Sequence, residues 1–596
     1  MKKAKHIPFD TIDQSLTERF ELMASMFPDK IAISDANESI TYDALNNKAN
    51  VIANEILGLT TKQKQVAFFL SDSIQQFISI LGILKAANAY VPLDTAWPAH
   101  RFEFAVKDSM ASAIITDNEN YGQVKAIASA AVVINIDEIN FITNTSEPNI
   151  KPRPDDIAHI LYTSGSTGEP KGVFTSHKNQ LHFTKRFSEF IDITPEDIFS
   201  YYFSIGFSAH AMPFLGAMLN GGTMHMYDLK KKGFPSLADF FISHGITISL
   251  MIPSVLRHFR VTLNKGFKFS KLRILLLGGE SLYHNDIKQI WPFLKRHTEI
   301  INIYASTELY LARAFRIQHD TILKHNIIPI GNAIEGMDID IVNEGGEECD
   351  PNIVGEMVIH SNYTALGYWN NPSLTKRDFH NHDGHRTFRS RDLAYKDADG
   401  LIVHVGRKDA MVKIRGQRAD LGEIENTLLS NEDIQEVAVA LKEDPQANKM
   451  LVGYYVSSPD KSVEMADIKN SLVRRLPEYM VPPYIMQLDT LPKTESGKTD
   501  YRSLPDPHWE SLADNRDIKH AKNPVEEQLV SIFERQLEVY PIGVTENILE
   551  AAHDSLKLFV AFDTIEKQFN IKIEIDSFIE TPTIEELALT IIQLQE

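Results

Sequence analysis

The sequence predicts an α/β protein with three parts: a large N-terminal domain of layered sheets and helices, a small α+β domain, and a C-terminal helical bundle. Up to Gly406 the chain alternates apolar runs, amphipathic stretches and glycine-rich turns, as layered α/β folds do. The elements then shorten. The polar stretch 505–523 lacks apolar periodicity, as a linker would, and helical patterns follow it.

The predicted elements follow in chain order. In the large domain, apolar runs predict strands at 66–70, 131–136, 246–252 and 272–277. In the small domain, the pattern predicts a strand at 411–414, a turn at Gly416, a helix at 421–429 and a strand at 437–441.

The last part reads as a small bundle. Asn523 and Pro524 make a good helix start, and Thr583 with Glu586 can form a capping box. Two helical faces are apolar: Val525, Leu529, Ile532, Phe533 and Leu537, then Leu556, Phe559, Phe562 and Phe569. We therefore expect domains at 1–408, 409–505 and 523–596, with a linker at 506–522.

Composition excludes several classes of protein. A formal net charge of -20 has the wrong sign for binding a nucleic-acid backbone. The single cysteine, Cys349, can form neither an internal disulfide nor a cysteine metal cluster, which fits a reducing cytoplasm. We expect no signal peptide, because no apolar stretch follows Lys2, Lys3 and Lys5, and no membrane span, because no later run approaches 18 apolar residues.

Residues 161–173, LYTSGSTGEPKGV, form the most informative loop. Its glycines, Gly165 and Gly168, let backbone amides approach an anion; its hydroxyls donate hydrogen bonds and Lys171 adds charge. Those hydroxyls belong to Thr163, Ser164, Ser166 and Thr167. A triphosphate suits such a loop. It is not the P-loop of nucleotide triphosphatases, and Gly497-Lys498-Thr499 fails as one because Pro492 stands where that motif needs glycine.

This loop resembles the phosphate loop of the adenylate-forming superfamily, and the order of the later motifs resembles adenylation domains of nonribosomal peptide synthetases. Residues 10–505 carry the resemblance. Its other motifs are ITYDALNNKAN (40–50), LKAANAYVPLD (84–94), IYASTE (303–308), GEMVIHSNYTALGYW (355–369), FRSRDL (388–393), GRKDAMVKIRGQRADLGEIE (406–425), LPEYMVP (476–482) and ESGKTDYRSL (495–504).

The resemblance implies roles for single residues. Lys498, Glu308 and Thr163 would act in catalysis: Lys498 between the carboxylate and the α-phosphate, Glu308 as the ligand of Mg²⁺. Other residues would bind ATP or AMP: Tyr304 against the adenine, Asp392 and Arg407 at the ribose, and also Thr163, Ser164, Gly165, Ser166, Thr167, Gly168, Lys171, Gly279, Thr307 and Lys498. Taken alone, Asp392 and Arg407 are equally an ion pair. Asp409 would be the hinge that moves Lys498 away and brings in the loop around Gly416.

The stretch NILEAAHDSLKLF (547–559) resembles a carrier-protein motif, which implies 4'-phosphopantetheine on Ser555. A serine that starts a helix is otherwise an ordinary N-cap. Ala552 and His553 replace the family's glycine pair. A phosphopantetheinyl transferase is the implied partner. Because the chain ends at Glu596, we expect a separate condensation, tailoring or release enzyme to take the acyl group.

The acid pocket departs from amino-acid-activating relatives, which place an aspartate after the phenylalanine of IGFSAHAMPF (205–214). Here Ser208 follows Phe207. Without a carboxylate partner a buried ammonium is costly, so we expect a small aryl, hydroxy, keto or short aliphatic acid. The aligned pocket residues are Phe207, Ser208, Ala209, Met212, Leu250, Leu276, Gly278, Ile303, Leu311 and Ala312. Two points stay open: whether the segment is misaligned by one residue or another acid, such as Asp228, supplies the charge, and whether His210 adds a polar contact or is a core residue.

The sequence therefore predicts ATP-dependent activation of a carboxylic acid and its loading on Ser555. Three rival functions stay open: a ligase acting on free coenzyme A, an amino-acid-activating module with an unusual pocket, and a silent scaffold that presents the carrier domain. Two further departures concern the nucleotide motifs. Arg391 stands where the family usually has glycine, and Ala305 with Ser306 replaces a Gly-Pro pair.

Overall fold

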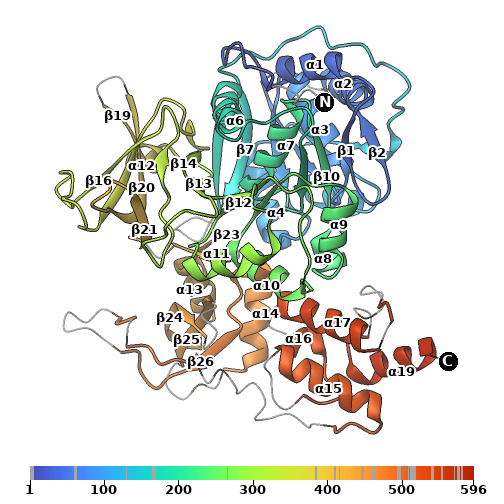
Figure 1. Cartoon of the computed structure of the whole chain (residues 1–596), viewed down its shortest axis with the longest axis vertical. Helices are drawn as coiled ribbons and strands as arrows, with labels where there is room; N and C mark the ends of the chain where they lie inside the picture. Colours follow the sequence, from blue (N-terminus) through green and yellow to red (C-terminus); the bar gives the residue numbers. More distant parts are fainter. Residues whose placement is uncertain are drawn as a thin grey trace.

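A computed structural model describes residues 6–595 except 60–62, 129–130, 164–169, 265, 383–384, 409–410, 415–416, 432, 445–448, 458–460, 462, 493–498, 502, 508, 510–518, 538–541, 552–554, 570, 574–577 and 579–580. The predicted fold class is confirmed. Figure 1 shows the large layered part above, the small α+β unit below it, and the helical bundle beside that unit. The predicted domain boundaries stay predictions.

A nine-stranded sheet forms the first layer. It is parallel from β13 to β1 and has antiparallel strands at both edges. The spatial order is β15 (Asn332–Ala333), β14 (Tyr310–Ile317), β13 (Glu299–Ser306), β12 (Ile274–Gly278), β11 (Ile248–Met251), β9 (Ile198–Tyr201), β10 (Thr223–Met226), β1 (Ile31–Ser34) and β2 (Ser39–Thr41). The predicted strands at 246–252 and 272–277 are β11 and β12, with shifted ends.

A seven-stranded sheet forms the second layer, and its central strands are parallel. Its order is β18 (Gly367–Tyr368), β8 (Lys171–Ser176), β7 (Ile157–Thr163), β4 (Ala89–Leu93), β3 (Gln65–Phe69), β5 (Ala113–Thr116) and β6 (Val132–Asn135). The strands predicted at 66–70 and 131–136 are β3 and β6. β7 carries the start of the phosphate loop.

A smaller antiparallel sheet completes the large part. It contains β16 (Asp338–Val342), β17 (Gly355–His360), β20 (His385–Lys396), β19 (Phe379–His382) and β21 (Ile402–Arg407). Its apolar face packs on Tyr304, Leu309 and Val173 of the two larger sheets. The ends of β20 and β21 therefore lie next to β13.

Helices fill and cover the two large sheets. α3 is buried along almost its whole length, and its Phe77 contacts Tyr201 of β9 and Phe214 of α7. A helix that is apolar on all sides belongs inside a protein. The helices of this part are α1 (Leu16–Met26), α2 (Tyr42–Leu59), α3 (Ile74–Lys85), α4 (Ala99–Ser109), α5 (Tyr121–Ile127), α6 (His177–Ile191), α7 (Ala211–Met218), α8 (Leu229–Lys232), α9 (Leu237–Ser243), α10 (Pro253–Thr262), α11 (His284–Ile290) and α12 (Pro372–Asp378).

The small α+β unit has the predicted strand, helix and strand order. β22 (Met411–Ile414) pairs with β23 (Gln417–Asp420), and α13 (Leu421–Leu429) follows, capped by the Asp420 side chain. The other elements are β24 (Ile434–Glu443), β25 (Lys449–Ser457), α14 (Met465–Arg475) and β26 (Tyr484–Gln487). α14 packs against α4 of the large part.

The C-terminal bundle contains α15 (Pro524–Leu537), α16 (Ile548–Ala551), α17 (Ser555–Phe569) and α19 (Ile584–Gln595). Asn523 and Thr583 accept hydrogen bonds from the backbone N–H groups of Glu526 and Glu586, as the predicted helix starts require. The first predicted apolar face and Phe562 of the second lie in one core. Among the described residues, no helix has the length and apolar character needed to cross a bilayer.

Gly331, just before β15, lies in close contact with the backbone of β14. A Cβ at Gly331 would lie 2.2 Å from the Ala314 carbonyl oxygen, whereas one at Gly346 would meet nothing within 4 Å. Both glycines have positive φ, 77° and 84°. We expect Gly331→Ala to lower the free energy of unfolding by about 2 kcal/mol more than Gly346→Ala, measured by urea unfolding. Equal losses would contradict this packing.

Candidate active site

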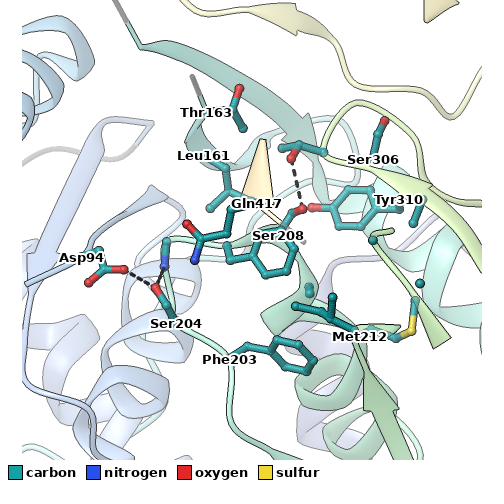
Figure 2. A pocket seen from close by; sticks show the side chains of 18 of the residues that line it. Asp94, Leu161, Thr163, Phe203, Ser204, Ser208, Met212, Ser306, Tyr310 and Gln417 are labelled. Carbon is teal, nitrogen blue, oxygen red and sulfur yellow. Dashed lines mark hydrogen bonds between the residues drawn. The ribbon is translucent and has the colours of Figure 1, made fainter. Parts of the chain in front are cut away.

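A cavity of about 110 Å³ lies where the two large sheets and the small α+β unit meet. Figure 2 shows its walls, which come from β7, the segment 203–212, β13 and β23. Most of the lining is apolar or aromatic: Trp97, Leu161, Tyr162, Phe183, Phe203, Phe207, Ala209, Met212, Leu250, Ile252, Ile303, Ala305, Tyr310 and Tyr479. The polar and glycine lining consists of Asp94, Arg101, Thr163, Ser204, Gly206, Ser208, Gly278, Gly279, Ser306, Thr307 and Gln417.

Most of the predicted acid pocket lines this cavity. The predicted residues in its wall are Phe207, Ser208, Ala209, Met212, Leu250, Gly278 and Ile303. Leu276, Leu311 and Ala312 do not line it, because they are buried in the cores that β12 and β14 share with their neighbours. The residue of β14 that reaches the cavity is Tyr310.

Tyr310 was missed because its placement depends on backbone that a sequence does not reveal. Its φ is 54°, an uncommon value for a residue with a large side chain. Its ring stacks on Phe183 at 4.9 Å, and its hydroxyl is 3.0 Å from Nε2 of buried His159. These contacts hold an aromatic wall in the cavity.

Ser208 lies close to the nucleotide motifs. The hydroxyl of Thr307 donates a hydrogen bond to Ser208 Oγ at 3.0 Å. Two further hydroxyls, Thr163 Oγ1 and Ser306 Oγ, are buried in the same wall and have no hydrogen-bond partner among the described residues. Buried polar atoms without partners are rare, so these two mark a place for a ligand's polar group.

The structure describes both Asp228 and His210, the residues on which the open points about the pocket depend. Asp228 is the N-cap of α8 and does not line the cavity. His210 is fully buried, with Nδ1 2.9 Å from the Phe207 carbonyl oxygen, and burial lowers its pKa to about 4. His210 is thus a core residue. The carboxylate that does line the cavity is Asp94, which accepts hydrogen bonds from Ser204 and from Ala96 N.

Glu308 and Lys171 come together from distant motifs. Lys171 Nζ lies 3.1 Å from Glu308 Oε1, and the hydroxyl of Tyr368 donates to the same oxygen at 3.2 Å. Glu308 is only 1% exposed. A buried carboxylate beside a lysine fits the predicted roles at Mg²⁺ and the phosphates, since Mg²⁺ prefers hard oxygen ligands.

Asp392 is also buried and paired. Arg407 NH1 donates to Asp392 Oδ1 at 2.7 Å, and the Tyr304 hydroxyl donates to Oδ2. Burial and then the Asp392 charge raise the pKa of Tyr304 well above its usual value. The ion-pair alternative therefore describes this structure, while the ribose contacts stay predictions. Arg391 has φ of 63°, which explains why glycine suits this position.

Several predicted residues lie outside the described part of the chain or are described only in part. Ser164, Gly165, Ser166, Thr167, Gly168, Asp409 and Lys498 are outside it, as are Ala552 and His553. Ser555 is the first residue of α17. Gly279 lines the cavity with φ of 92°. Their predicted roles stay predictions.

The small α+β unit contributes directly to the cavity. Gln417 and Tyr479 both line it. The predicted turn at Gly416, next to Gln417, lies outside the described part of the chain. Arg101 NH1 on α4 lies 3.8 Å from Glu423 Oε1 on α13, and both side chains are nearly fully buried. Arg101, Gln417 and Tyr479 were also missed by sequence reasoning, because only the folded arrangement of the two parts brings them together.

The helical bundle contacts the large part through α17. This helix packs against α10, and Lys567 Nζ lies 3.5 Å from the Thr262 carbonyl oxygen. Figure 1 shows the two helices next to each other below the large sheets. The helix that begins with Ser555 is therefore held against the part that contains the cavity walls.

Residues 20–369 match the family model described as AMP-binding enzyme. The chain belongs to the AMP-binding enzyme family. In this family member, residues 423–498 match the AMP-binding enzyme C-terminal domain, and residues 527–591 match the phosphopantetheine attachment site. These matches confirm the sequence-based assignment to adenylate-forming enzymes with an added carrier domain.

The relatives of this AMP-binding enzyme are longer proteins. It is 33% identical to bacitracin synthase 1 of Bacillus licheniformis over 96% of the chain and 11% of that protein. It is 31% identical to tyrocidine synthase 1 of Brevibacillus parabrevis over 97% of the chain and 52% of that protein. The chain thus spans about half or less of these relatives.

Solved structures share the fold. With a TM-score of 0.77 and 22% identity, this chain matches holo-PA1221, an NRPS protein containing adenylation and PCP domains bound to a vinylsulfonamide inhibitor. The match covers 93% of this chain and 92% of the other. A match to o-succinylbenzoate CoA synthetase of Bacillus subtilis has a TM-score of 0.74 and 20% identity, covering 83% and 99% of the two chains.

The buried state of His210 predicts a pH effect on stability. The folded protein keeps this imidazole neutral down to about pH 4, whereas the unfolded chain binds a proton near pH 6.5. Its contribution is therefore present above pH 6.5 and is lost as the pH falls toward 4. Between pH 7.5 and 5.5 we expect a loss of about 1 kcal/mol from this group, measured by urea unfolding. His210→Gln should remove that part of the pH dependence, and an unchanged dependence would contradict it.

Proposed function

We propose that this AMP-binding enzyme joins a carboxylic acid to AMP and passes the acyl group to a phosphopantetheine thiol on Ser555. In the first reaction a carboxylate oxygen attacks the α-phosphorus of ATP, and the bond to pyrophosphate breaks. The acyl carbon then bonds to sulfur as AMP leaves, and the thiol proton passes to solvent. Support comes above all from the cavity, whose wall joins the nucleotide motifs, the acid pocket and Gln417.

The residues present fit ATP and Mg²⁺. The hydroxyls of Thr163 and Ser306, which have no partner in the described part of the chain, offer hydrogen bonds at one end of the cavity. Lys171 offers positive charge near the phosphates and Glu308 an oxygen ligand for the metal ion. We assign Lys498 to the developing charge on the α-phosphate, as a positioned cation stabilises a transition state.

The carrier domain fits phosphopantetheine. Ser555 supplies a hydroxyl for its phosphate, and it begins α17, a helix whose N-terminus favours an anion. When bound, the arm supplies the thiol that takes the acyl group. The contact of α17 with α10 supports transfer within one chain. A phosphopantetheinyl transferase would load the arm, and a downstream catalytic unit would take the acyl group.

The proposed substrate is a small carboxylic acid without an α-ammonium group. Ser208 occupies the position at which an aspartate would pair with the ammonium, and the surrounding wall is mostly apolar. Asp94 favours a second candidate, an amino acid whose ammonium pairs with this other carboxylate of the cavity wall. The two candidates differ in the substituent next to the carboxyl group.

Exchange of labelled pyrophosphate into ATP tests the activation step. We expect exchange that depends on an added acid and falls at least 100-fold in Lys498→Ala, because the variant lacks the transition-state cation. Ser555→Ala should leave the rate of pyrophosphate exchange unchanged, since Ser555 acts only in acyl transfer. Exchange that is absent over a broad panel of acids would contradict the proposed function and favour a silent scaffold. Formation of a soluble thioester on free coenzyme A would favour the rival ligase.

Loss of the ion pair between Arg101 and Glu423 is expected to affect acyl transfer and acid activation to different degrees. The pair joins α4 to α13 in the arrangement that places Gln417 in the cavity wall. Removing one partner of a buried ion pair leaves the other charge uncompensated. We expect Glu423→Gln to slow acyl transfer to the carrier about tenfold and to change pyrophosphate exchange less than twofold. Rapid-quench measurements of both steps check this, and equal slowing of both would contradict it.

A further inference from the structure

We infer that the activated acid carries an oxygen on the carbon next to its carboxyl group, as a 2-oxo or 2-hydroxy acid, and that Ser208 donates a hydrogen bond to that oxygen. This inference rests on the proposed function. It deepens that function by naming the substituent that the cavity recognises.

The first observation is the direction of the hydrogen bond between Thr307 and Ser208. A hydroxyl group has one hydrogen to donate and two lone pairs that accept. Because Thr307 Oγ1 donates to Ser208 Oγ, this bond uses a lone pair of Ser208 and leaves its hydrogen. The described residues give Ser208 Oγ no second hydrogen bond, and Ser208 lines the cavity. Its hydrogen is thus left for a group in the cavity.

The orientation of the acid gives the second step. At one end of the cavity, the hydroxyls of Thr163 and Ser306 have no hydrogen-bond partner among the described residues, so a carboxylate or phosphate oxygen would be satisfied there. Figure 2 shows Ser208 between this end and the apolar end formed by Phe203 and Met212. With its carboxylate at the polar end, an acid places its second carbon near Ser208 and its tail among the apolar side chains.

The third observation concerns which side chains of the cavity wall carry charge. An oxo or hydroxyl oxygen accepts a hydrogen bond, whereas an ammonium group only donates. The other lining residues of the segment 207–212, which contains Ser208, are Phe207, Ala209 and Met212, and they carry no charge. In Figure 2, Asp94 lies with Ser204 on the side of the cavity away from Met212 and Tyr310, and its carboxylate already accepts two hydrogen bonds. An oxygen therefore suits the Ser208 position better than an ammonium.

Two sets of four acids, each set sharing one carbon skeleton, test the inference. We would measure kcat/KM for pyrophosphate exchange with the 2-oxo, 2-hydroxy, 2-amino and unsubstituted acids of the valine and phenylalanine skeletons. The expected result is a preference of at least tenfold for the 2-oxo or 2-hydroxy acid over the unsubstituted acid, because the latter leaves the Ser208 hydrogen without an acceptor. The two oxygenated acids then show which oxidation state is used.

Variants of Ser208 make the test specific. Ser208→Ala should reduce the preference to below threefold, whereas Ser208→Asp should raise exchange with the 2-amino acid relative to the 2-oxo acid. Ser249→Ala is the matched control, since it removes a buried serine hydroxyl outside the cavity wall and should leave the ratios unchanged. Ratios between acids do not depend on the fraction of folded variant.

Three outcomes would overturn the inference. A best rate with the 2-amino acid that is lost in Asp94→Asn would assign recognition to Asp94. Equal rates with oxygenated and unsubstituted acids would remove the hydrogen bond but leave the proposed function intact. Silence with all eight acids and with a further panel of aryl acids would overturn the proposed function as well.

Discussion

The wall of the cavity is complete only because two parts of the chain with separate hydrophobic cores meet over it. The large sheets supply the acid pocket and the nucleotide motifs, and the small α+β unit adds Gln417 and Tyr479. A reactive acyl-AMP must be kept from water and still be reached by a thiol, so an enzyme of this kind gains from a movable wall. The buried pair of Arg101 and Glu423 holds the observed arrangement, and the contact of α17 with α10 brings the carrier domain to the same assembly.

Buried charges in the nucleotide region are paired inside the protein. Lys171 lies against Glu308, and Arg407 lies against Asp392, with tyrosine hydroxyls bonded to both carboxylates. Such pairing offsets the cost of removing charges from water and keeps the side chains in place before ligands arrive. By contrast, the hydroxyls of Thr163 and Ser306 find no partner within the residues that the structure describes. The polar end of the cavity thus combines fixed charges with open hydrogen-bonding positions.

Sequence reasoning found what local patterns and ordered motifs encode. Strands such as β12 and the capped helices of the bundle follow from apolar periodicity and helix-start signals. The family resemblance gave Lys171 and Glu308 separate roles at ATP and Mg²⁺, and the structure brings the two side chains together. The wall residues Tyr310, Asp94 and Arg101 were not predicted. Tyr310 depends on an unusual φ, and the other two depend on how distant elements pack. Likewise, the alignment placed Leu311 in the pocket, whereas β14 turns Tyr310 toward the cavity. An alignment does not reveal that orientation.

We propose that one chain both activates an acid and loads its own carrier domain. The most direct measurement is the intact mass of the chain after treatment with a phosphopantetheinyl transferase, followed by ATP, Mg²⁺ and the best acid of the panel. The account predicts an added phosphopantetheine and acyl mass, mapped by peptide mass spectrometry to Ser555, at a rate independent of protein concentration. Adenylate formation without acylation of Ser555, or loading whose rate rises with protein concentration, would contradict it.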